Sequence, residues 1–247
     1  NDPLIVTEEC ADDPEMLAKA IECLGWGRII ENNGQVCASP KRTLVHRRAH
    51  DAFVKALVKF VSSLKRGHAT DPEAQLTRLV TEEAAQRVVE QVQHTVDQGA
   101  TLVYGGKRDG AAMDVTILDN VTADMDIATD MEVFGPVVPI ITFDTDEEAV
   151  AIANASKYGL SASVITSDMK KSFYYTEAIE ASAVWVNGSS ALRHNDQPFG
   201  GTKSTGIGNE GGGYSCEEFS RLKTYGFCGV SPKKRLFDHG DGMGGFL

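Results

Sequence analysis

The chain contains 247 residues, of which 42% are apolar and 24% charged, values ordinary for a globular protein with a substantial buried core. Its formal net charge of -11 argues against nucleic acid or an anionic membrane as a partner, and no apolar run is long enough to span a bilayer. The five cysteines are scattered, without the spacing of a zinc site or a disulfide framework. Their pattern predicts no metal and favours a reducing, cytoplasmic location.

The first half of the chain alternates short apolar runs with amphipathic segments. Asp13 precedes Pro14, a combination typical of a helix start, and Thr81 is followed by two glutamates as at a capped helix N-terminus. The spacing of apolar residues predicts the remaining elements. These are strand 4–6, a helix from Pro14 toward Gly25 and Gly27, strand 43–46, helix 53–64, a helix from Thr81 to Gly99, and strands 102–104 and 115–118.

The second half follows a regular β-α-β-α-β order. Strand 137–143, helix 147–155, strand 160–165, helix 169–179 and strand 183–187 follow one another with short connections. This order predicts an α/β fold, with a parallel twisted sheet covered by helices on both faces. We expect one domain over residues 1–222, a terminal strand over 223–231, and a flexible glycine-rich tail over 232–247.

Cys37 is the candidate nucleophile. It ends the polar run Asn32-Asn33-Gly34-Gln35-Val36-Cys37, which is poor core material but lets a carbonyl oxygen approach main-chain N–H groups. A thiol in such a turn can add to a carbonyl carbon and hold it as a covalent intermediate. The other four cysteines are interpreted as small apolar packing residues.

Glu132 is the second candidate site residue. It begins the run Glu132-Val133-Phe134-Gly135-Pro136-Val137, in which the glycine and proline predict a fixed turn before a strand. A lone glutamate is usually a solvated surface carboxylate. At a fixed, partly buried turn it suits bidentate hydrogen bonding to a diol.

Five segments, in the same order and at similar spacings, resemble the aldehyde dehydrogenase superfamily over roughly residues 3–230. They are Asn33-Gly34-Gln35-Val36-Cys37, Glu132-Val133-Phe134-Gly135-Pro136-Val137, Asn187, Pro198-Phe199-Gly200-Gly201 with Lys203, and Gly206-Ile207-Gly208-Asn209-Glu210. The resemblance implies that residues 1–222 form the catalytic domain of that family.

The resemblance also implies a role for each of five residues. Cys37 matches the nucleophile that forms a thiohemiacetal with an aldehyde, loses a hydride to NAD or NADP, and becomes a thioester. Its main-chain N–H matches an oxyanion-hole donor. Glu132 matches the carboxylate that holds the nicotinamide ribose, and Phe134 the aromatic side chain that helps position the ring. Asn187 and Phe199 match residues near the substrate pocket, although their sequence context suits a strand-end cap and a core residue equally well.

Residues 206–211 fit the G-x-G-x-x-G pattern of dinucleotide-binding loops. That pattern requires a preceding hydrophobic strand, whereas Gly200-Gly201-Thr202-Lys203-Ser204-Thr205 precedes it here. The dinucleotide interpretation is therefore rejected, and the resemblance implies a structural loop near the active site.

The cofactor-binding half of the family is not present in the sequence. The resemblance places the general base in a Glu-Leu-Gly-Gly segment ahead of Asn1, and the chain does not begin with Met. We therefore expect a portion of a longer enzyme that is inactive as a dehydrogenase when isolated, because hydride transfer requires close register of cofactor and substrate.

The substrate group and assembly state are less constrained. The stretch Cys-Ala-Ser-Pro-Lys-Arg resembles succinate-semialdehyde dehydrogenases, but Glu31 occupies the position where that group often has an arginine. Arg193 could replace it, although a surface arginine is the simpler interpretation. The resemblance implies that residues 224–230 pair with a neighbouring subunit, which predicts a homodimer or a higher homo-oligomer.

Two other functions remain open. The same fold could serve as a non-catalytic assembly or regulatory protein, a possibility that the missing half supports. Alternatively, Cys37 could act as a cysteine-dependent esterase without cofactor, since its thiol can accept acyl groups. His194 lies nearest by family position as a base for that reaction, but its context favours a solvent-facing histidine.

Overall fold

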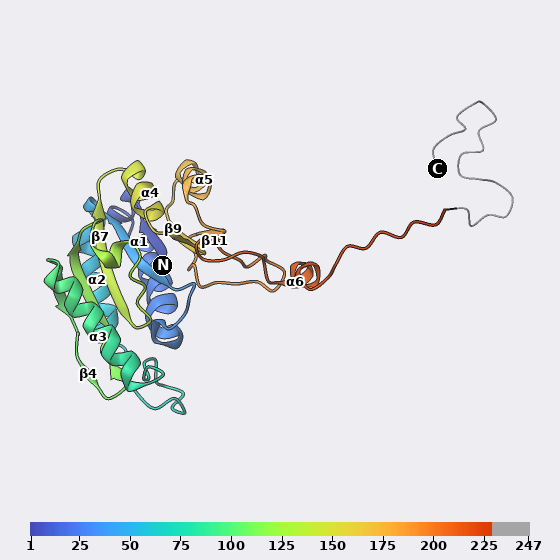
Figure 1. Cartoon of the computed structure of the whole chain (residues 1–247). Helices are drawn as coiled ribbons and strands as arrows, with labels where there is room; N and C mark the ends of the chain where they lie inside the picture. Colours follow the sequence, from blue (N-terminus) through green and yellow to red (C-terminus); the bar gives the residue numbers. More distant parts are fainter. Residues whose placement is uncertain (229–247) are drawn as a thin grey trace.

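Seven strands form the central sheet of the part of the chain that the structure describes, residues 1–228 of a computed structural model (Figure 1). Their order across the sheet is β10-β9-β1-β2-β7-β6-β3. The strands are β1 (Asp2–Val6), β2 (Pro40–His46), β3 (Thr101–Tyr104), β6 (Thr116–Val121), β7 (Val137–Phe143), β9 (Ser161–Ile165) and β10 (Ala183–Val186).

The sheet is parallel except at one edge. Five neighbouring pairs run parallel, whereas β3 pairs antiparallel with β6. The chain between β3 and β6 contains only the small hairpin of β4 (Arg108–Asp109) and β5 (Ala112–Met113), with no helix to carry it back across the sheet. A short connection permits only an antiparallel return. The predicted parallel α/β sheet is confirmed, with this antiparallel edge as an addition.

Within residues 1–228, six helices accompany the sheet, and two of them begin at the caps that the sequence predicts. The Asp13 carboxylate accepts hydrogen bonds from the main-chain N–H groups of Glu15 and Met16, and the Thr81 hydroxyl accepts one from Ala84. The helices are α1 (Pro14–Leu24), α2 (His50–Ser62), α3 (Glu82–Asp97), α4 (Asp146–Asn154), α5 (Met169–Ala178) and α6 (Gly212–Glu218).

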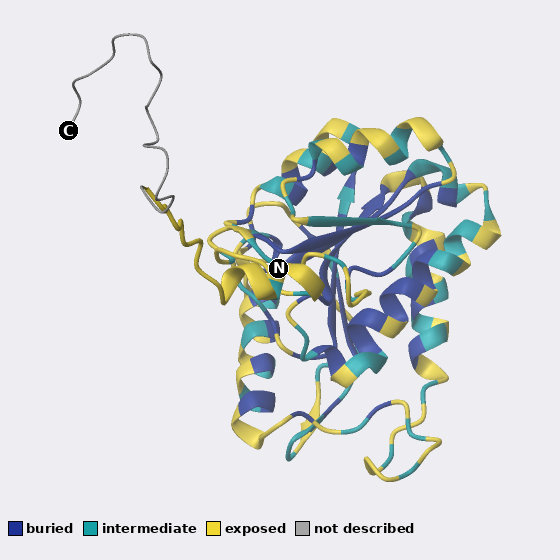
Figure 2. Cartoon of the chain, turned by 90° about the vertical axis from the view of Figure 1, so that its right-hand side faces the viewer, coloured by how far each residue is buried: buried dark blue, intermediate teal, exposed yellow. Residues whose placement is uncertain are grey.

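Helices cover both faces of the sheet, as Figure 2 shows by the buried strands between partly exposed helices. Alternate residues of one strand point to opposite faces. In β1, Leu4 and Val6 pack with α1 and α2, whereas Ile5 packs in the second core with α3, α4 and α5. The two hydrophobic cores fix the register of the sheet, since a shift of one residue would exchange the two faces.

Several short elements interrupt the main pattern. α1 ends at Leu24, in agreement with the predicted end toward Gly25 and Gly27, and the π-helix η2 (Gly25–Ile30) follows it directly. Four short 3-10 turns and a second small antiparallel pair complete the body. They are η1 (Glu8–Ala11), η3 (Glu31–Gly34), η4 (Arg47–Ala49), η5 (Asp126–Ala128), and β8 (Tyr158–Gly159) with β11 (Thr202–Lys203).

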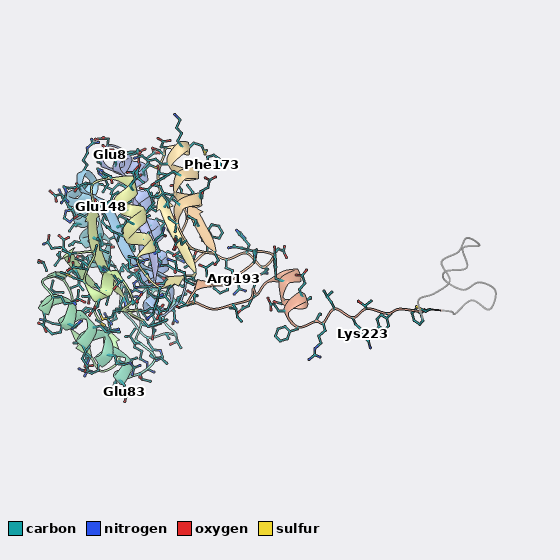
Figure 3. The ribbon with its side chains drawn as sticks, turned by 45° about the horizontal axis from the view of Figure 1, so that its top comes forward. Glu8, Glu83, Glu148, Phe173, Arg193 and Lys223 are labelled. Carbon is teal, nitrogen blue, oxygen red and sulfur yellow. The ribbon has the colours of Figure 1, made fainter. Side chains whose placement is uncertain are left out.

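A C-terminal arm, residues 206–228, extends away from the body and carries α6 (Figure 1). Lys223, labelled in Figure 3, lies on this arm, far from the helices that cover the sheet. Residues 224–228 are exposed and form no strand within the described chain. The rest of the predicted terminal strand 223–231 and the whole predicted tail 232–247 lie outside the described residues. Within residues 1–228, no helix has the length and apolar character needed to cross a membrane.

Candidate active site

Cys37 and Glu132 lie at the same end of the sheet, the end at which the parallel strands begin. The Cys37 loop precedes β2 and the Glu132 loop precedes β7, and these two strands are parallel neighbours. Neighbouring parallel strands begin at the same end of a sheet. The topology therefore brings together two segments separated by more than ninety positions in the sequence.

The Cys37 loop turns through three consecutive left-handed residues. Asn32, Asn33 and Gly34 have φ angles of 48°, 52° and 72°. Asn33 is buried, and its side chain bonds to Thr77 twice: its amide nitrogen donates to the Thr77 hydroxyl at 2.8 Å, and its oxygen accepts from the Thr77 N–H at 3.1 Å. Asparagine and glycine are the residues that tolerate this backbone region, which explains the Asn-Asn-Gly run before the cysteine.

Cys37 itself is exposed, and the main-chain carbonyls of the residues on either side of it accept hydrogen bonds. Ser190 donates its hydroxyl to the carbonyl of Ala38 at 2.7 Å, and the N–H of Ser39 donates to the carbonyl of Val36 at 3.3 Å. Within the described residues, the N–H of Cys37 donates to no acceptor. An exposed thiol beside an unengaged N–H is the arrangement that an oxyanion-forming nucleophile requires.

The Glu132 loop is anchored through its main chain. The Gln91 side chain of α3 donates to the carbonyl of Glu132 at 3.2 Å, and Val133 is buried. The Glu132 side chain is 24% exposed and the adjacent Phe134 is 43% exposed. The carboxylate and the aromatic face are therefore accessible on a turn whose backbone is fixed.

Arg28 joins the two loops. Its guanidinium is fully buried and donates to the carbonyls of Val137 (2.7 Å), Gly34 (3.2 Å) and Val133 (3.1 Å), and to the Ser39 hydroxyl (3.0 Å). Burial lowers the pKa of Arg28 to about 9, a change that the nearby Glu132 carboxylate opposes. The π-turn of η2 carries this side chain, and such turns are frequent at functional sites.

Lys41 also contacts both loops. It is 2% exposed, and its ammonium donates to the carbonyls of Val36 (2.7 Å) and Cys37 (2.6 Å). The same nitrogen lies 3.1 Å from Glu132 Oε1 and 5.1 Å from the centre of the Phe134 ring. The amino nitrogen of Asn1 lies 3.8 Å from the same Glu132 oxygen.

Two cavities open at this site. The larger has a volume of about 870 Å³, and its lining includes Gln35, Arg78, Arg87, Glu132 and Phe134. The smaller has a volume of about 450 Å³, and its lining includes Cys37, Phe199, the loop of residues 205–210, and residues of α6 and just after it. The structure thus groups Glu132 with Phe134 in one cavity and Cys37 with Phe199 in the other. Lys41 lines neither cavity but contacts the Cys37 carbonyl and the Glu132 carboxylate.

Asn187 lies at the opposite end of the sheet, where the parallel strands finish. It follows the carboxyl end of β10, which runs parallel to β9. Its side-chain amide donates to the carbonyl of Thr166 at 2.9 Å and accepts from the Thr166 N–H at 3.0 Å, with φ at 56°. These contacts are those of a strand-end cap, and the structure does not bring Asn187 to Cys37.

The charged groups around the smaller cavity are largely paired. Arg193 stacks over the Phe199 ring at 4.3 Å and bonds to Glu210 at 3.1 Å. The described residues that line the cavity include Glu210 and Glu218 but no lysine or arginine. Glu31 lines neither cavity, and burial raises the pKa of its carboxyl. A substrate carboxylate would therefore find no cation in this lining.

His194 has no contact that marks it as a base for Cys37. It is exposed, and its ring centre lies 5.8 Å from that of Trp185. Within the described residues, no group of three His, Cys, Asp or Glu side chains is arranged to hold a metal ion.

The sequence interpretation missed Arg28 and Lys41. The available signal was a set of cations inside apolar surroundings: Arg28 precedes Ile29-Ile30, and Lys41-Arg42 precede Thr43-Leu44-Val45 in a strand. Lysine and arginine are almost never fully buried unless they are paired. Their acceptors lie in loops that are distant in sequence, so the sequence alone does not identify the partners.

The sequence matches the aldehyde dehydrogenase family over residues 1–225. Among curated proteins, it is 36% identical to a lactaldehyde dehydrogenase of Methanococcus aeolicus over 224 residues, covering 91% of this chain and 46% of that protein. It is 39% identical to the mitochondrial succinate-semialdehyde dehydrogenase of Homo sapiens over 196 residues, covering 78% of this chain and 36% of that protein.

Solved structures give the same relationship. A glyceraldehyde-3-phosphate dehydrogenase of Methanocaldococcus jannaschii, crystallised with NADP, superposes with a TM-score of 0.84 at 37% identity, covering 90% of this chain and 47% of that one. A succinate-semialdehyde dehydrogenase of Burkholderia pseudomallei gives a TM-score of 0.81 at 33% identity, covering 89% of this chain and 45% of that one. The chain thus spans less than half the length of these relatives. The match over residues 1–225, together with the neighbouring loops that bring Cys37 and Glu132 to the same end of the sheet, establishes that this chain belongs to the aldehyde dehydrogenase family.

Proposed function

We propose that the chain is the catalytic portion of an NAD(P)-dependent aldehyde dehydrogenase, with Cys37 as the nucleophile. The observation that carries the proposal is the presentation of Cys37: an exposed side chain, an unengaged N–H among the described residues, and a buried connection through Lys41 to Glu132. The relatives, which are named as dehydrogenases of aldehydes, support the same reaction class.

The residues around the larger cavity fit part of a nicotinamide dinucleotide. A volume of about 870 Å³ lies within the range of ligand sites. Glu132 offers carboxylate oxygens to a ribose diol, Phe134 offers an exposed aromatic face to a ring, and Arg87 and Arg78 offer cations on the rim. When bound, the oxidised nicotinamide accepts a hydride.

At Cys37, the thiolate attacks the carbonyl carbon of the aldehyde. A carbon–sulfur bond forms, and the carbonyl π electrons move to the oxygen, where the Cys37 N–H stabilises the developing charge. Departure of the hydride from that carbon leaves a thioester. Water then cleaves the carbon–sulfur bond, releasing the carboxylic acid and restoring the thiol.

The isolated chain is proposed to lack dehydrogenase activity. Efficient hydride transfer requires the cofactor and the Cys37 adduct in fixed register, and Glu132 and Phe134 contact only a small part of a dinucleotide. No steady formation of NADH or NADPH from aldehydes is expected for residues 1–247 alone. Sustained turnover by this chain would overturn this part of the proposal.

The nucleophile itself is tested with a nitrophenyl ester, which requires no cofactor. We expect release of nitrophenolate and an acyl group on Cys37 detectable by mass spectrometry, both abolished in Cys37→Ala. Cys216 and Cys228, which the sequence predicts to be packing residues, are exposed as well. Cys228 offers the matched control because it lines neither cavity, so Cys228→Ala should leave the reaction unchanged. An acyl-transfer rate that is the same with and without Cys37 would contradict the assignment.

The same assay evaluates the alternative functions. Continuous ester turnover with Cys37 would favour a cysteine-dependent esterase, whereas a single acylation that stops would fit a dehydrogenase portion that lacks its base. A chain without any Cys37 acylation would favour the non-catalytic role. A longer protein that carries the family's remaining half is the natural setting for the first proposal.

We propose that the arm mediates homo-oligomer formation. Ile207, Phe219, Leu222, Tyr225 and Phe227 are all large, apolar and strongly exposed on it, and exposed apolar patches of this kind mark interaction surfaces. Sedimentation velocity should show a dimer or larger species that Leu222→Asp dissociates. Met169→Asp, at an exposed apolar residue of α5, should not, and a monomeric wild-type chain would contradict the proposal.

A further inference from the structure

Lys41 is an unusual choice for the second residue of a buried strand. Its ammonium is removed from water and surrounded by two carbonyl oxygens, one carboxylate oxygen and an aromatic ring. Desolvation of an ammonium is expensive, and an apolar side chain of similar volume often gives equal or greater stability at such sites. Packing alone therefore does not explain a lysine here.

The charged groups that face Lys41 come from several elements. Asp2 of β1 and Glu132 favour the ammonium, whereas Arg28 of η2 and burial disfavour it, with burial the largest effect, so that the pKa of Lys41 is lowered. The carbonyls of Val36 and Cys37 and the Glu132 carboxylate together offer three acceptors, which match the three N–H groups of an ammonium. The two carboxylates thus help to keep Lys41 in its hydrogen-bonding form.

The geometry of one peptide bond gives Lys41 a specific consequence. The carbonyl of Val36 and the N–H of Cys37 belong to the same trans peptide, in which they point in opposite directions. Lys41 holds the Val36 oxygen at 2.7 Å on its own side. The Cys37 N–H consequently points away from Lys41, where no described residue accepts its hydrogen.

We propose that Lys41 is a positioning residue that fixes the orientation of the Val36–Cys37 peptide, and thereby presents the Cys37 N–H to a developing oxyanion. Its bond to the Cys37 carbonyl secures the next peptide as well, and Glu132 supplies the counter-charge. This inference rests on the proposed function of Cys37 as nucleophile. It adds a residue that acts through the main chain rather than by touching substrate.

Two reactions of the same sulfur separate this role from a general structural one. Acylation by a nitrophenyl ester forms a sulfur–carbon bond, passes through a tetrahedral oxyanion, and expels nitrophenolate, while the thiol proton goes to solvent. Alkylation by iodoacetamide displaces iodide without forming an oxyanion. Loss of a correctly oriented donor slows the first reaction and not the second, whereas a change in thiolate fraction or access affects both.

The experiment compares both rates at Cys37 in the 247-residue chain and its Lys41→Met variant, with site-resolved mass spectrometry. The ratio of acylation rate to alkylation rate should fall at least about tenfold in Lys41→Met. Lys157→Met provides the matched control. Lys157 also lies beside a carboxylate, Asp130 at 3.6 Å, and over an aromatic ring, that of Tyr158. Its ratio should equal that of the wild type.

Buried Cys10 and Cys23 report folding in the same samples, since both should remain unlabelled in a folded variant. If the two cysteines become labelled in Lys41→Met, the Lys41→Gln variant is used in its place. The glutamine side chain keeps an N–H donor but is too short to reach the carbonyls of both Val36 and Cys37. A folded variant at position 41 with an unchanged ratio overturns the inference while leaving the proposed nucleophile intact. A wild-type chain that acylates no faster than Cys37→Ala overturns the proposed function and this inference together.

Discussion

Gly34 and Gly135 hold the two loops of the site at main-chain contact distance. A Cβ atom built on Gly34 would lie 2.6 Å from the carbonyl oxygen of Gly135 and 2.5 Å from that of Arg28. Both obstacles are backbone atoms, which cannot rotate away as a side chain would. The close approach of the Cys37 and Glu132 loops therefore depends on a glycine at position 34, which also has a φ of 72°.

Gly34→Ala should destabilise the chain by about 2 kcal/mol or more, because backbone strain and the clash with the Gly135 carbonyl act together. The free energy of unfolding in urea measures the effect. Gly213→Ala is the matched control, since a Cβ there meets nothing within 4 Å, and its change should stay within about 1 kcal/mol. Equal effects of the two substitutions would show that the loops do not constrain each other.

Arg28→Met should be among the most destabilising substitutions in the chain. It would leave three buried carbonyls and the Ser39 hydroxyl without the donor that binds them. A loss of about 3 kcal/mol or more in the free energy of unfolding is expected. Arg47→Met removes a surface pair with Asp144 and should change stability little. A comparably small effect at position 28 would refute the role assigned to its guanidinium.

The cysteines should differ in alkylation according to burial. Burial raises the pKa of both Cys10 and Cys23 to about 11, so that only about a thousandth of either thiol would be thiolate at pH 8. Iodoacetamide at that pH should modify exposed Cys37 while Cys10 and Cys23 remain unmodified. Their labelling should rise as the pH approaches 11, provided that the chain stays folded. Cys23 modified as fast as Cys37 at pH 8 would contradict both the burial and the nucleophile assignments.

Stability should depend on pH through His50, the first residue of α2. Its ring nitrogens lie 2.8 Å from Asp119 and 2.9 Å from Asp51. Burial lowers the pKa of His50, but the two carboxylates outweigh burial and raise it above its usual value of 6.5. The protonated ring therefore stabilises the fold fully below pH 6.5, and this contribution disappears as the pH rises through the folded-state pKa.

Urea unfolding between pH 5.5 and 8.5 measures this contribution. The free energy of unfolding of the wild type should decrease more steeply over this range than that of His50→Asn. Asp119→Asn should flatten the same slope, since it removes the partner from β6. Parallel curves for the wild type and both variants would show that this pair does not contribute to folding.

Much of the fold could be predicted because its signals are local. The side chains of Asp13 and Thr81 cap the helices that they were expected to begin, and the alternating second half gave the parallel sheet. The helix expected to run toward Gly25 and Gly27 does end at Leu24. No local pattern predicts the π-helix that follows it through Ile30 and carries Arg28, because the acceptors of that buried side chain are distant in sequence.

Candidate site residues divide in the same way. The turns that carry Cys37 and Glu132 could be predicted from local Asn-Gly and Gly-Pro signals, whereas the roles of Glu132 and Phe134 rest on the family resemblance. Asn187 was placed with them by motif order, whereas the structure positions it at the carboxyl end of β10. The order of motifs along the chain does not say at which end of the strands a loop lies. That is decided by the direction in which each strand runs.

The amino-acid sequence by itself determined the exposed cysteine on its asparagine–glycine turn, the accessible glutamate and phenylalanine, and the alternation of strands and helices. Only the tertiary structure decided that β2 and β7 are neighbours and that Arg28 and Lys41 bind the carbonyls of the loops that precede them. The physical reason is that turns and caps depend on contacts between residues close in sequence. The pairing of a buried cation depends on acceptors that only the folded chain brings within hydrogen-bonding distance.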